Sequence, residues 1–404
     1  MTPKLKLDPP DDSPAVLPAT PFHALPMQVR LAYYGVATPG AAAPILWGMP
    51  GTGKTTFAGL IAQALDMHFI TVLFSDRAPE DIGGTPMPVG DAMRRYPPDF
   101  ALEAAQVAGT GRRVLILADE ITTVPPPVQA PLLRFTLERV CGDVKLDADR
   151  VRLMCAANPV EQAANGQEVA HALASRMQHV SWEPLPIEMW SEYEMAGGVS
   201  DLTLPEFPEA EWADRLPESR ARIAAFLRSR PSAYAEDPMK AEGRGHGQFA
   251  SPRSWSKFAR VRAAALALKD QDAVVPLATG LLGDPVAIEY ATWERKHDLP
   301  DAEQVLSGKV RFEHDEKRPD RTFAVMMAVA AIATAEKPAK EFADRWSRAW
   351  GVLGYTLKDG VGKDFVATAA RVLAKKRPAG GVLRDDVQKI IASLSGIVRE
   401  AGLA

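Results

Sequence analysis

The stretch "WGMPGTGKTT" (residues 47–56) decides the fold that we expect for this chain. Gly48, Gly53, Lys54 and Thr55 match the spacing G-x-x-x-x-G-K-[ST]. In this pattern the glycines let successive backbone N–H groups point at phosphate oxygens, the lysine reaches the β- and γ-phosphates, and the hydroxyl can ligate Mg²⁺. A helix that begins at Thr55 adds the positive end of its dipole. The stretch therefore predicts a nucleotide site.

The plainer alternative is a chance glycine turn. The context favours a phosphate loop, because the apolar run "PILW" (44–47) precedes the glycines and a helical pattern follows them. We expect ATP and Mg²⁺ at this site. The residues expected to contact the nucleotide are Gly48, Pro50, Gly51, Thr52, Gly53, Lys54, Thr55 and Thr56.

Short apolar runs alternate with helical patterns from Met27 to about Pro184. The runs typical of buried strands are 44–47, 69–75, 114–119 and 151–158, and the helical patterns are 55–65, 98–109 and 127–140. This alternation predicts an α/β fold in which helices cover both faces of a parallel sheet. Together with the phosphate loop, it predicts a P-loop NTPase domain over residues 27–186.

The remaining segments differ in composition. Residues 1–26 are rich in Pro and Asp, and we expect a flexible tail. Residues 187–310 are predicted to be a loop-rich connection, with one short helix near Arg220–Arg230, followed by a helical lid that contains a helix over 252–267. Residues 311–404 are predicted to be a helical region of unknown role. Helix breaks are expected at Gly280, Pro300, Pro319 and Pro338.

Two acids end the apolar run "VLILADE". An acid at the carboxyl end of a parallel strand beside the phosphate loop can hold Mg²⁺, and this suits Asp119. Glu120 is then placed to orient and polarise the attacking water. The alternative is that the pair simply caps a helix. The four apolar residues that lead directly into the acids favour the catalytic interpretation.

Three further side chains are candidates for the same chemistry. Asn158 ends the run "MCAAN", where an amide can position the water or contact the γ-phosphate; alternatively it is a turn residue before Pro159. Arg176 in "LASRM" can reach the γ-phosphate of a neighbouring subunit, and Arg253 in "SPRSW" can close over the phosphates of its own chain. For both arginines the alternative is a solvated surface side chain.

These features together resemble the AAA+ ATPases, and more closely the MoxR-type branch. The resemblance runs from about Pro44 to Leu282 and rests on "GMPGTGKT", "LADEITTVPPPVQAPLLRFTLE", "CAANP", "LASRM" and "SPRSW". It implies the following roles: Asp119 and Glu120 form the Walker B pair, Asn158 is sensor 1, Arg176 is the arginine finger and Arg253 is sensor 2. The family's usual Asn-Arg after the two acids is replaced here by Thr122-Thr123, which puts any contact made through that pair in doubt.

A segment between the second strand and the next helix, "DIGGTPMPVGDAMRRYPPD" (81–99), has no assigned role in the phosphate chemistry. In the MoxR-type branch this place holds an inserted loop that faces the central pore of a ring. By that resemblance Ile82, Met87 and Tyr96 could touch a partner. An irregular surface loop is the alternative.

Composition excludes some classes of protein. The 404 residues carry 47 Lys and Arg against 51 Asp and Glu, so the net charge of −4 gives no support to general nucleic-acid binding. Two cysteines form no disulfide framework, and no apolar run is long enough to span a bilayer. We expect a cytoplasmic protein.

The sequence therefore predicts an ATPase that hydrolyses Mg-ATP to ADP and phosphate. The resemblance implies that it assembles as a homo-oligomeric ring, expected to be a hexamer, and remodels or activates a protein substrate in a chaperone-like manner. It also implies a partner with a von Willebrand factor A domain. One alternative is a nucleic-acid motor or a McrB-like nucleotide-driven restriction subunit, for which Arg94-Arg95 and Arg112-Arg113 are the compact basic candidates. The other is a nucleotide switch that does not hydrolyse ATP.

Overall fold

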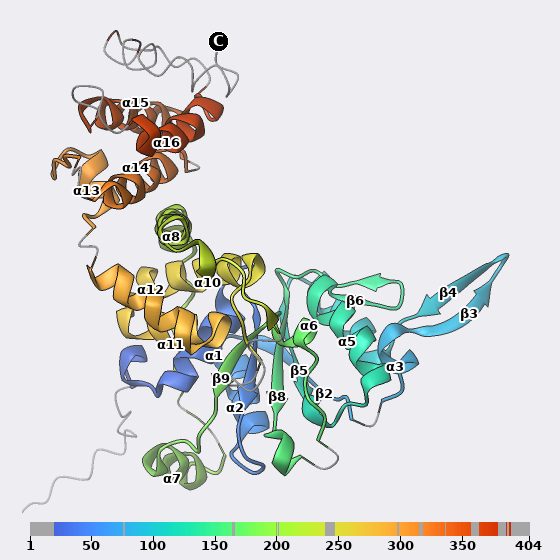
Figure 1. Cartoon of the computed structure of the whole chain (residues 1–404). Coiled ribbons are helices and arrows are strands. Elements are labelled where there is room, and N and C mark those ends of the chain that lie inside the picture. The colour runs from blue at the N-terminus through green and yellow to red at the C-terminus, as the bar shows by residue number, and fades with distance from the viewer. Residues whose placement is uncertain are drawn as a thin grey trace, which may run out of the picture.

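Five parallel strands form the central sheet of the computed structural model, in the order β2-β5-β8-β1-β9 (Figure 1). All four strands predicted from apolar runs are confirmed, and a fifth strand directly follows Arg176. Their bounds are β1 (Ala43–Trp47), β2 (Met67–Leu73), β5 (Arg113–Asp119), β8 (Val151–Ala157) and β9 (Met177–Ser181).

The structure describes residues 20–378, with gaps at 76, 164–165, 199, 201, 239–246, 297–298, 315–317, 336 and 357–362, and in addition residues 385 and 388. The predicted tail falls mostly outside these residues. Its last part, however, is folded onto the domain. Phe22 lies in a short 3-10 helix (Phe22–Ala24) with its ring 5.0 Å from that of Tyr33, and Leu25 is buried. The tail boundary expected at residue 26 therefore lies too far along the chain, because these apolar side chains find a surface to pack against.

Alternate residues of each strand face two separate apolar cores, as the two-residue period of a strand requires. In β5, for example, Leu115 and Leu117 belong to the first core, while Ile116 and Ala118 belong to the second. Helices α1 (Met27–Ala37) and α2 (Lys54–Ala64) contribute to the first core, and α4 (Asp99–Gly109) and α5 (Pro126–Glu138) to the second. Helices thus cover both faces of the sheet, which confirms the predicted P-loop NTPase fold.

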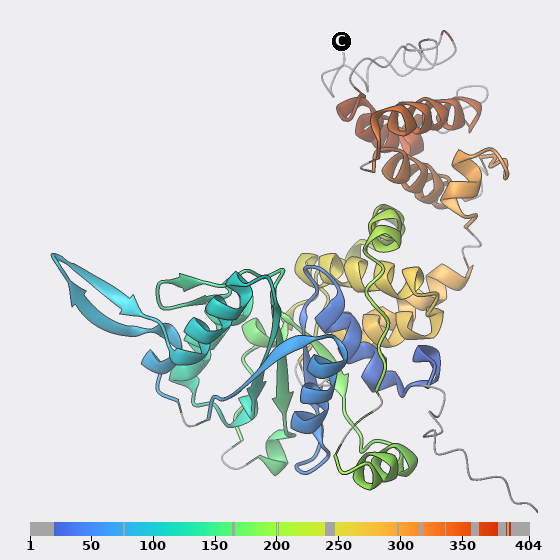
Figure 2. The ribbon, with the colours of Figure 1, turned by 180° about the vertical axis from the view of Figure 1, so that it is seen from behind.

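A two-stranded hairpin stands away from the sheet in both opposite views (Figures 1 and 2). It consists of β3 (Thr85–Val89) and β4 (Ala92–Tyr96), which pair antiparallel, and it follows the short helix α3 (Glu80–Gly83). Most of the segment 81–99, residues 85–96, is therefore a regular hairpin rather than an irregular loop. Met87 and Tyr96 are exposed on it, but Ile82 is fully buried in α3 and cannot offer its side chain to a partner there.

The lid contains more helix than the sequence predicts. Helix α8 runs over Glu209–Ser229, where we expected only a short helix near Arg220–Arg230, and it continues through Pro217. Its buried side chains include Trp212, Leu216 and Phe226, so packing against its neighbours outweighs the local cost of the proline. The other lid helices are α10 (Pro252–Ala267), α11 (Val274–Leu282) and α12 (Asp284–Lys296).

The break expected at Gly280 is wrong, because α11 continues to Leu282. A Cβ atom at Gly280 would lie 2.3 Å from the backbone oxygen of His179 in β9. The glycine therefore permits α11 to pack closely on the sheet, and the helix ends before Gly283, whose φ is +85°.

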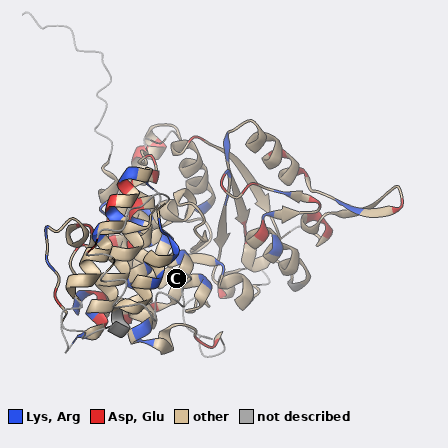
Figure 3. Cartoon of the chain, turned by 90° about the horizontal axis from the view of Figure 1, so that it is seen from above, with Lys and Arg blue, Asp and Glu red and all other residues tan. Residues whose placement is uncertain are grey.

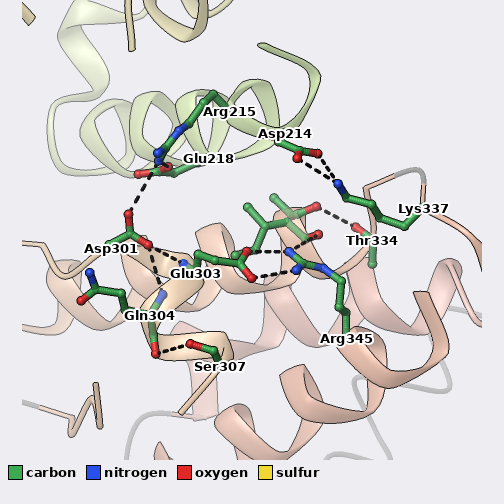
Figure 4. Close-up of polar contacts among 12 residues, drawn as sticks. Asp214, Arg215, Glu218, Asp301, Glu303, Gln304, Ser307, Thr334, Lys337 and Arg345 are labelled. Atoms are coloured by element: carbon green, nitrogen blue, oxygen red, sulfur yellow. Dashed lines mark hydrogen bonds and ion pairs between the residues drawn. The ribbon is translucent and has the colours of Figure 1, made fainter. Parts of the chain in front are cut away.

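The last described helices form a unit with a third apolar core. They are α13 (Ala302–Leu306), α14 (Pro319–Ala333), α15 (Ala339–Thr356) and α16 (Lys363–Lys375). Because α13 contributes Val305 and Leu306 to this core, the unit includes residues that we had placed before the boundary at 310. Ion pairs join it to α8, among them Lys337 with Asp214 at 2.7 Å and Asp301 with Arg215 at 3.6 Å (Figure 4).

None of the helices in the described part of the chain combines the length and apolar character needed to cross a membrane. Both cysteines, Cys141 and Cys155, are buried free thiols, and burial raises the pKa of each to about 12.

Candidate nucleotide-binding site

The phosphate loop connects the end of β1 to the start of α2. Gly51 and Gly53 have φ of +79° and +80°, values that side chains other than glycine rarely adopt. Gly48 is required for another reason: a Cβ atom there would lie 2.3 Å from the backbone oxygen of Trp182. The loop surface is open, since Pro50, Gly51, Gly53, Thr55 and Thr56 are all exposed.

Lys54 occupies the first position of α2 and points back into this loop. Its Nζ donates to the backbone oxygens of Gly48 (2.7 Å) and Met49 (2.9 Å) and to Oδ1 of Asn158 (2.9 Å). Burial lowers the pKa of Lys54, whereas the nearby carboxylates of Asp119 and Glu120 act in the opposite direction. The ammonium group is thus held beside the candidate sensor, where a phosphate oxygen could replace the carbonyl oxygens as its partner.

Asp119 and Thr55 are brought together from different elements. The Thr55 hydroxyl donates to Oδ2 of Asp119 at 2.7 Å, and Oδ1 accepts the backbone N–H of Glu120 at 2.9 Å. A hydroxyl and a carboxylate side by side are the hard oxygen ligands that Mg²⁺ prefers. The residues present therefore fit the predicted magnesium site.

Glu120 has a left-handed backbone conformation, with φ of +56°. Such a value is uncommon for a residue other than glycine, and strain of this kind concentrates at functional sites. One side-chain oxygen of Glu120 accepts a hydrogen bond from Ser75 at 3.4 Å. Ser75 comes just after β2, so two neighbouring strands place the candidate base. Sequence reasoning missed Ser75, because no motif marks it.

Thr122, which stands where the MoxR-type proteins that the sequence resembles usually have asparagine, is fully buried. Its Oγ1 accepts the backbone N–H of Asn158 at 3.3 Å, and its backbone oxygen accepts the N–H of Gln167 at 2.7 Å. Thr122 therefore connects the acidic end of β5 to the residue that follows β8, Asn158.

Trp182, which directly follows β9, holds the phosphate loop in place. Nothing in the sequence predicts this role. Its backbone N–H donates to the oxygen of Trp47 at 2.6 Å, and its indole N–H donates to the oxygen of Thr52 at 3.1 Å. The ring also packs on Phe57 of α2 with the centroids 4.4 Å apart. Both ends of the loop are thus anchored to one residue, the first through its backbone N–H and the second through its indole N–H.

Arg176 and Arg253 lie together, but at the opposite edge of the sheet. Arg176 immediately precedes β9, whose first residue Met177 pairs with Ala43 at the start of β1. Arg253 donates to Oγ of Ser175 at 3.3 Å, and its charge, after burial, contributes to lowering the pKa of Arg176. We call the end of the sheet at which the parallel strands begin the amino edge. The end at which they finish, where the phosphate loop lies, is the carboxyl edge.

The length of β1 separates the two edges by roughly 13 Å, at about 3.3 Å per residue. In this geometry the Arg253 side chain lies beside Arg176 rather than over the phosphate loop of its own chain, and its closure over those phosphates stays a prediction. The guanidinium is directed to the amino edge by the contact between α10 and the segment before β9. The site residues therefore form two groups, with Lys54, Thr55, Asp119, Glu120 and Asn158 in one and the two arginines in the other.

This fold and this carboxyl-edge geometry define a P-loop nucleotide-binding protein. Residues 44–176 match the profile of the "ATPase family associated with various cellular activities (AAA)". The matched segment includes the phosphate loop, both acids, Asn158 and Arg176. No curated protein matches the chain.

Two solved structures are similar to the chain. One is a "putative ATPase" from Cytophaga hutchinsonii, with a TM-score of 0.42 and 20% identity, over 63% of this chain and 80% of that one. The other is a full-length MCM homolog from Methanopyrus kandleri, with a TM-score of 0.37 and 13% identity, over 65% of this chain and 54% of that one. Nothing about activity follows from likenesses this distant.

Proposed function

We propose that this chain hydrolyses Mg-ATP as a ring-forming AAA+ protein of MoxR type and uses the energy to remodel or activate a protein partner. The observation that carries the proposal is the separation of the site residues onto two edges of one sheet. The carboxyl edge holds the phosphate loop and the acids, and the amino edge holds Arg176 and Arg253. A chain of this kind completes its site when the amino edge of a second copy meets its carboxyl edge.

The carboxyl edge supplies the hydrolytic groups. Lys54 pairs with the β- and γ-phosphates, and Glu120 accepts a proton from the water that attacks the γ-phosphorus as the bond to the leaving ADP breaks. Asn158 is placed beside Lys54 to orient the same phosphate. Mg²⁺, held by Thr55 and Asp119, would supply positive charge that neutralises the phosphate oxygens.

The amino edge supplies cations in trans. An arginine finger from a neighbour stabilises charge in the transition state and is worth ~10³–10⁵ in rate. Because Arg176 and Arg253 lie side by side, we assign both of them to the active site of the neighbouring subunit. We expect six copies in the ring on the resemblance to the MoxR-type branch alone.

A protein partner is supported by the hairpin β3–β4. Met87, Val89 and Tyr96 are exposed on one face of it, and Met93 is exposed on the other. Exposed large apolar side chains of this kind mark protein contacts. A partner with a von Willebrand factor A domain follows from the resemblance alone.

The nucleic-acid alternative finds less support. Arg94 lies 3.8 Å from Asp143, Arg112 lies 3.6 Å from Asp66, and Arg113 donates to the backbone oxygen of Leu65. Basic and acidic segments are also interspersed over the helices of the lid and the C-terminal unit (Figure 3). A groove for a nucleic-acid backbone would need a continuous line of cations, whereas Arg94 and Arg112 each have a carboxylate as neighbour.

Mixing inactive variants tests the proposal. Arg176→Ala and Lys54→Ala should each abolish hydrolysis, whereas their mixture should regain part of it, because an intact loop of one chain can meet an intact arginine of the other. Arg253→Ala mixed with Lys54→Ala should behave in the same way if Arg253 acts in trans.

The matched control is Lys54→Ala mixed with Glu120→Gln. Both substitutions damage the carboxyl edge, so every site stays defective and the mixture should remain inactive. If the arginine mixtures also stay inactive although the variants co-assemble, action in trans is refuted.

A further inference from the structure

A small cavity of about 100 Å³ lies at the amino edge of the sheet, next to the start of β1. Every charged side chain that lines it is basic: Arg139, Arg152, Arg176, Arg253 and Lys257. These residues come from four places in the chain, namely the end of α5, the start of β8, the turn before β9 and the first turns of α10. The fold therefore gathers five cations around one space.

The hydrogen-bond partners of these cations within the described residues are uncharged, although the carboxylates of Asp149 and Asp147 lie near enough to Arg152 to act against the lowering of its pKa by burial. Arg152 donates to the backbone oxygen of Ala148 at 3.1 Å, and Lys257 donates to that of Gly40 at 2.8 Å. Arg139 and Arg176 likewise donate to backbone oxygens of their own helices, while the Nε atom of each is buried without a hydrogen-bond partner. No ion pair joins any of the five to a described carboxylate. The cluster therefore has hydrogen-bond donors and positive charge that could bind an anion.

Burial and the clustered positive charge lower the pKa of Lys257, which shows that the arrangement is unfavourable without an anion. Burial, and then the positive charges of Arg260, Arg139, Arg253 and Arg152, lower the pKa of Lys257 to about 8. Burial likewise lowers the pKa of Arg139 to about 10. Buried charge is ordinarily paired, because the desolvation of an isolated ion is expensive. An anion inside the cavity would offset this cost.

We infer that the cavity is an oxyanion site for a phosphate group, with Arg139, Arg152 and Lys257 as its inner donors and Arg176 and Arg253 at its entrance. A volume of about 100 Å³ corresponds to roughly three water molecules at ~30 Å³ each. That space suits a tetrahedral phosphate group. The phosphate comes either from the nucleotide on a second copy, which would rest on the proposed function, or from free inorganic phosphate.

Chemical modification of Lys257 can detect anion binding at this site without a measurement of ATP hydrolysis. The full chain carrying Lys54→Ala is used, so that its own phosphate loop no longer competes for the anion. The rate at which an amine-reactive reagent modifies Lys257 is measured by mass spectrometry at a pH near 8, with and without inorganic phosphate. Phosphate should slow the modification, because a bound anion favours the protonated amine. A rise of one pKa unit would reduce the neutral fraction, and hence the rate, about fivefold. The exposed Lys340 on α15 serves as the internal control and should not respond.

Two further variants identify the donors. Arg152→Gln should weaken the effect of phosphate on Lys257. Arg150→Gln should leave it unchanged, since Arg150 is exposed outside the cavity and pairs with Asp147. An effect that survives Arg152→Gln at full size would refute the inner-donor assignment.

The source of the phosphate is decided by a parallel experiment. If free phosphate has no effect, the same labelling is done on the assembled Glu120→Gln chain with ATP. Slowing by phosphate indicates the free anion, and slowing only by ATP in the assembly indicates the nucleotide of a second copy. If neither changes the labelling of Lys257, the oxyanion site is refuted. Failure of the variant mixtures described above, with Lys257 still responding to phosphate, would refute the ring but not the site.

Discussion

Trp182→Phe tests whether the indole beneath the phosphate loop holds the loop ready for nucleotide. The substitution keeps an aromatic ring against Phe57 but removes the indole N–H that donates to the oxygen of Thr52 at 3.1 Å. The backbone hydrogen bond from Trp182 to Trp47 is unaffected. The change therefore releases one end of the loop while leaving its other anchor in place.

The expected magnitude follows from that one hydrogen bond. A neutral hydrogen bond contributes about 1 kcal/mol net, and 1.4 kcal/mol is a factor of ten in an equilibrium constant. Loss of the bond should reduce the population of the binding-competent loop about fivefold, and the apparent Kd for ATP should rise by the same factor. The smaller ring should also lower the free energy of unfolding by about 1–3 kcal/mol, since Trp182 is only 2% exposed.

Trp346→Phe is the matched control for this experiment. Trp346 is also 2% exposed and its indole N–H donates to the backbone oxygen of Leu373 at 2.8 Å, but it belongs to the C-terminal unit. ATP titrations by calorimetry and urea unfolding should show similar losses of stability for both variants and weaker ATP binding for Trp182→Phe alone. Equal ATP affinity for the wild type and Trp182→Phe would refute the assigned role of the indole.

Two other variants probe the site and the attachment of the lid. Glu120→Gln should bind ATP with unchanged affinity and lose hydrolysis by a factor on the order of 10² or more, because an amide is a poor base; a phosphate-release assay showing the wild-type rate would exclude Glu120 as the base. Asp270→Ala should lower the free energy of unfolding by about 3–5 kcal/mol, since it strands a buried guanidinium. The Asp270 carboxylate accepts from Arg30 at 2.6 Å and from the Tyr34 hydroxyl at 2.9 Å. A urea midpoint close to that of the wild type would show that this network is not a main attachment between α1 and the lid.

The carboxyl-edge residues could be predicted because their geometry is local. A strand, a glycine turn and a helix follow one another at Gly48–Thr55, so the motif contains its own structural frame. Asp119 and Asn158 could be added because parallel strands end at a common edge. Residues that act through a short, regular piece of backbone leave a readable signal in the sequence.

Other features depend on contacts between distant segments and leave no such signal. The helix α8 forms across Pro217 because its apolar side chains find neighbours in the lid, and Gly280 serves a close contact with β9 rather than a helix break. Trp182 supports a loop about 130 residues before it in the chain. Helix propensity and motif spacing predict none of these three features, because each feature depends on the residues that pack against it in the folded chain.

Arg253 illustrates both what the sequence determines and what only the tertiary structure determines. The sequence by itself determined that an arginine begins the helix over 252–267, and with it the phosphate loop, the acids and the α/β fold. Only the tertiary structure decided that this arginine lies beside Arg176 at the amino edge, about one strand length from the phosphate loop of its own chain. The physical reason is that the register between β1 and β9 and the docking of α10 are fixed by long-range packing, whereas a motif specifies only the chain immediately around it.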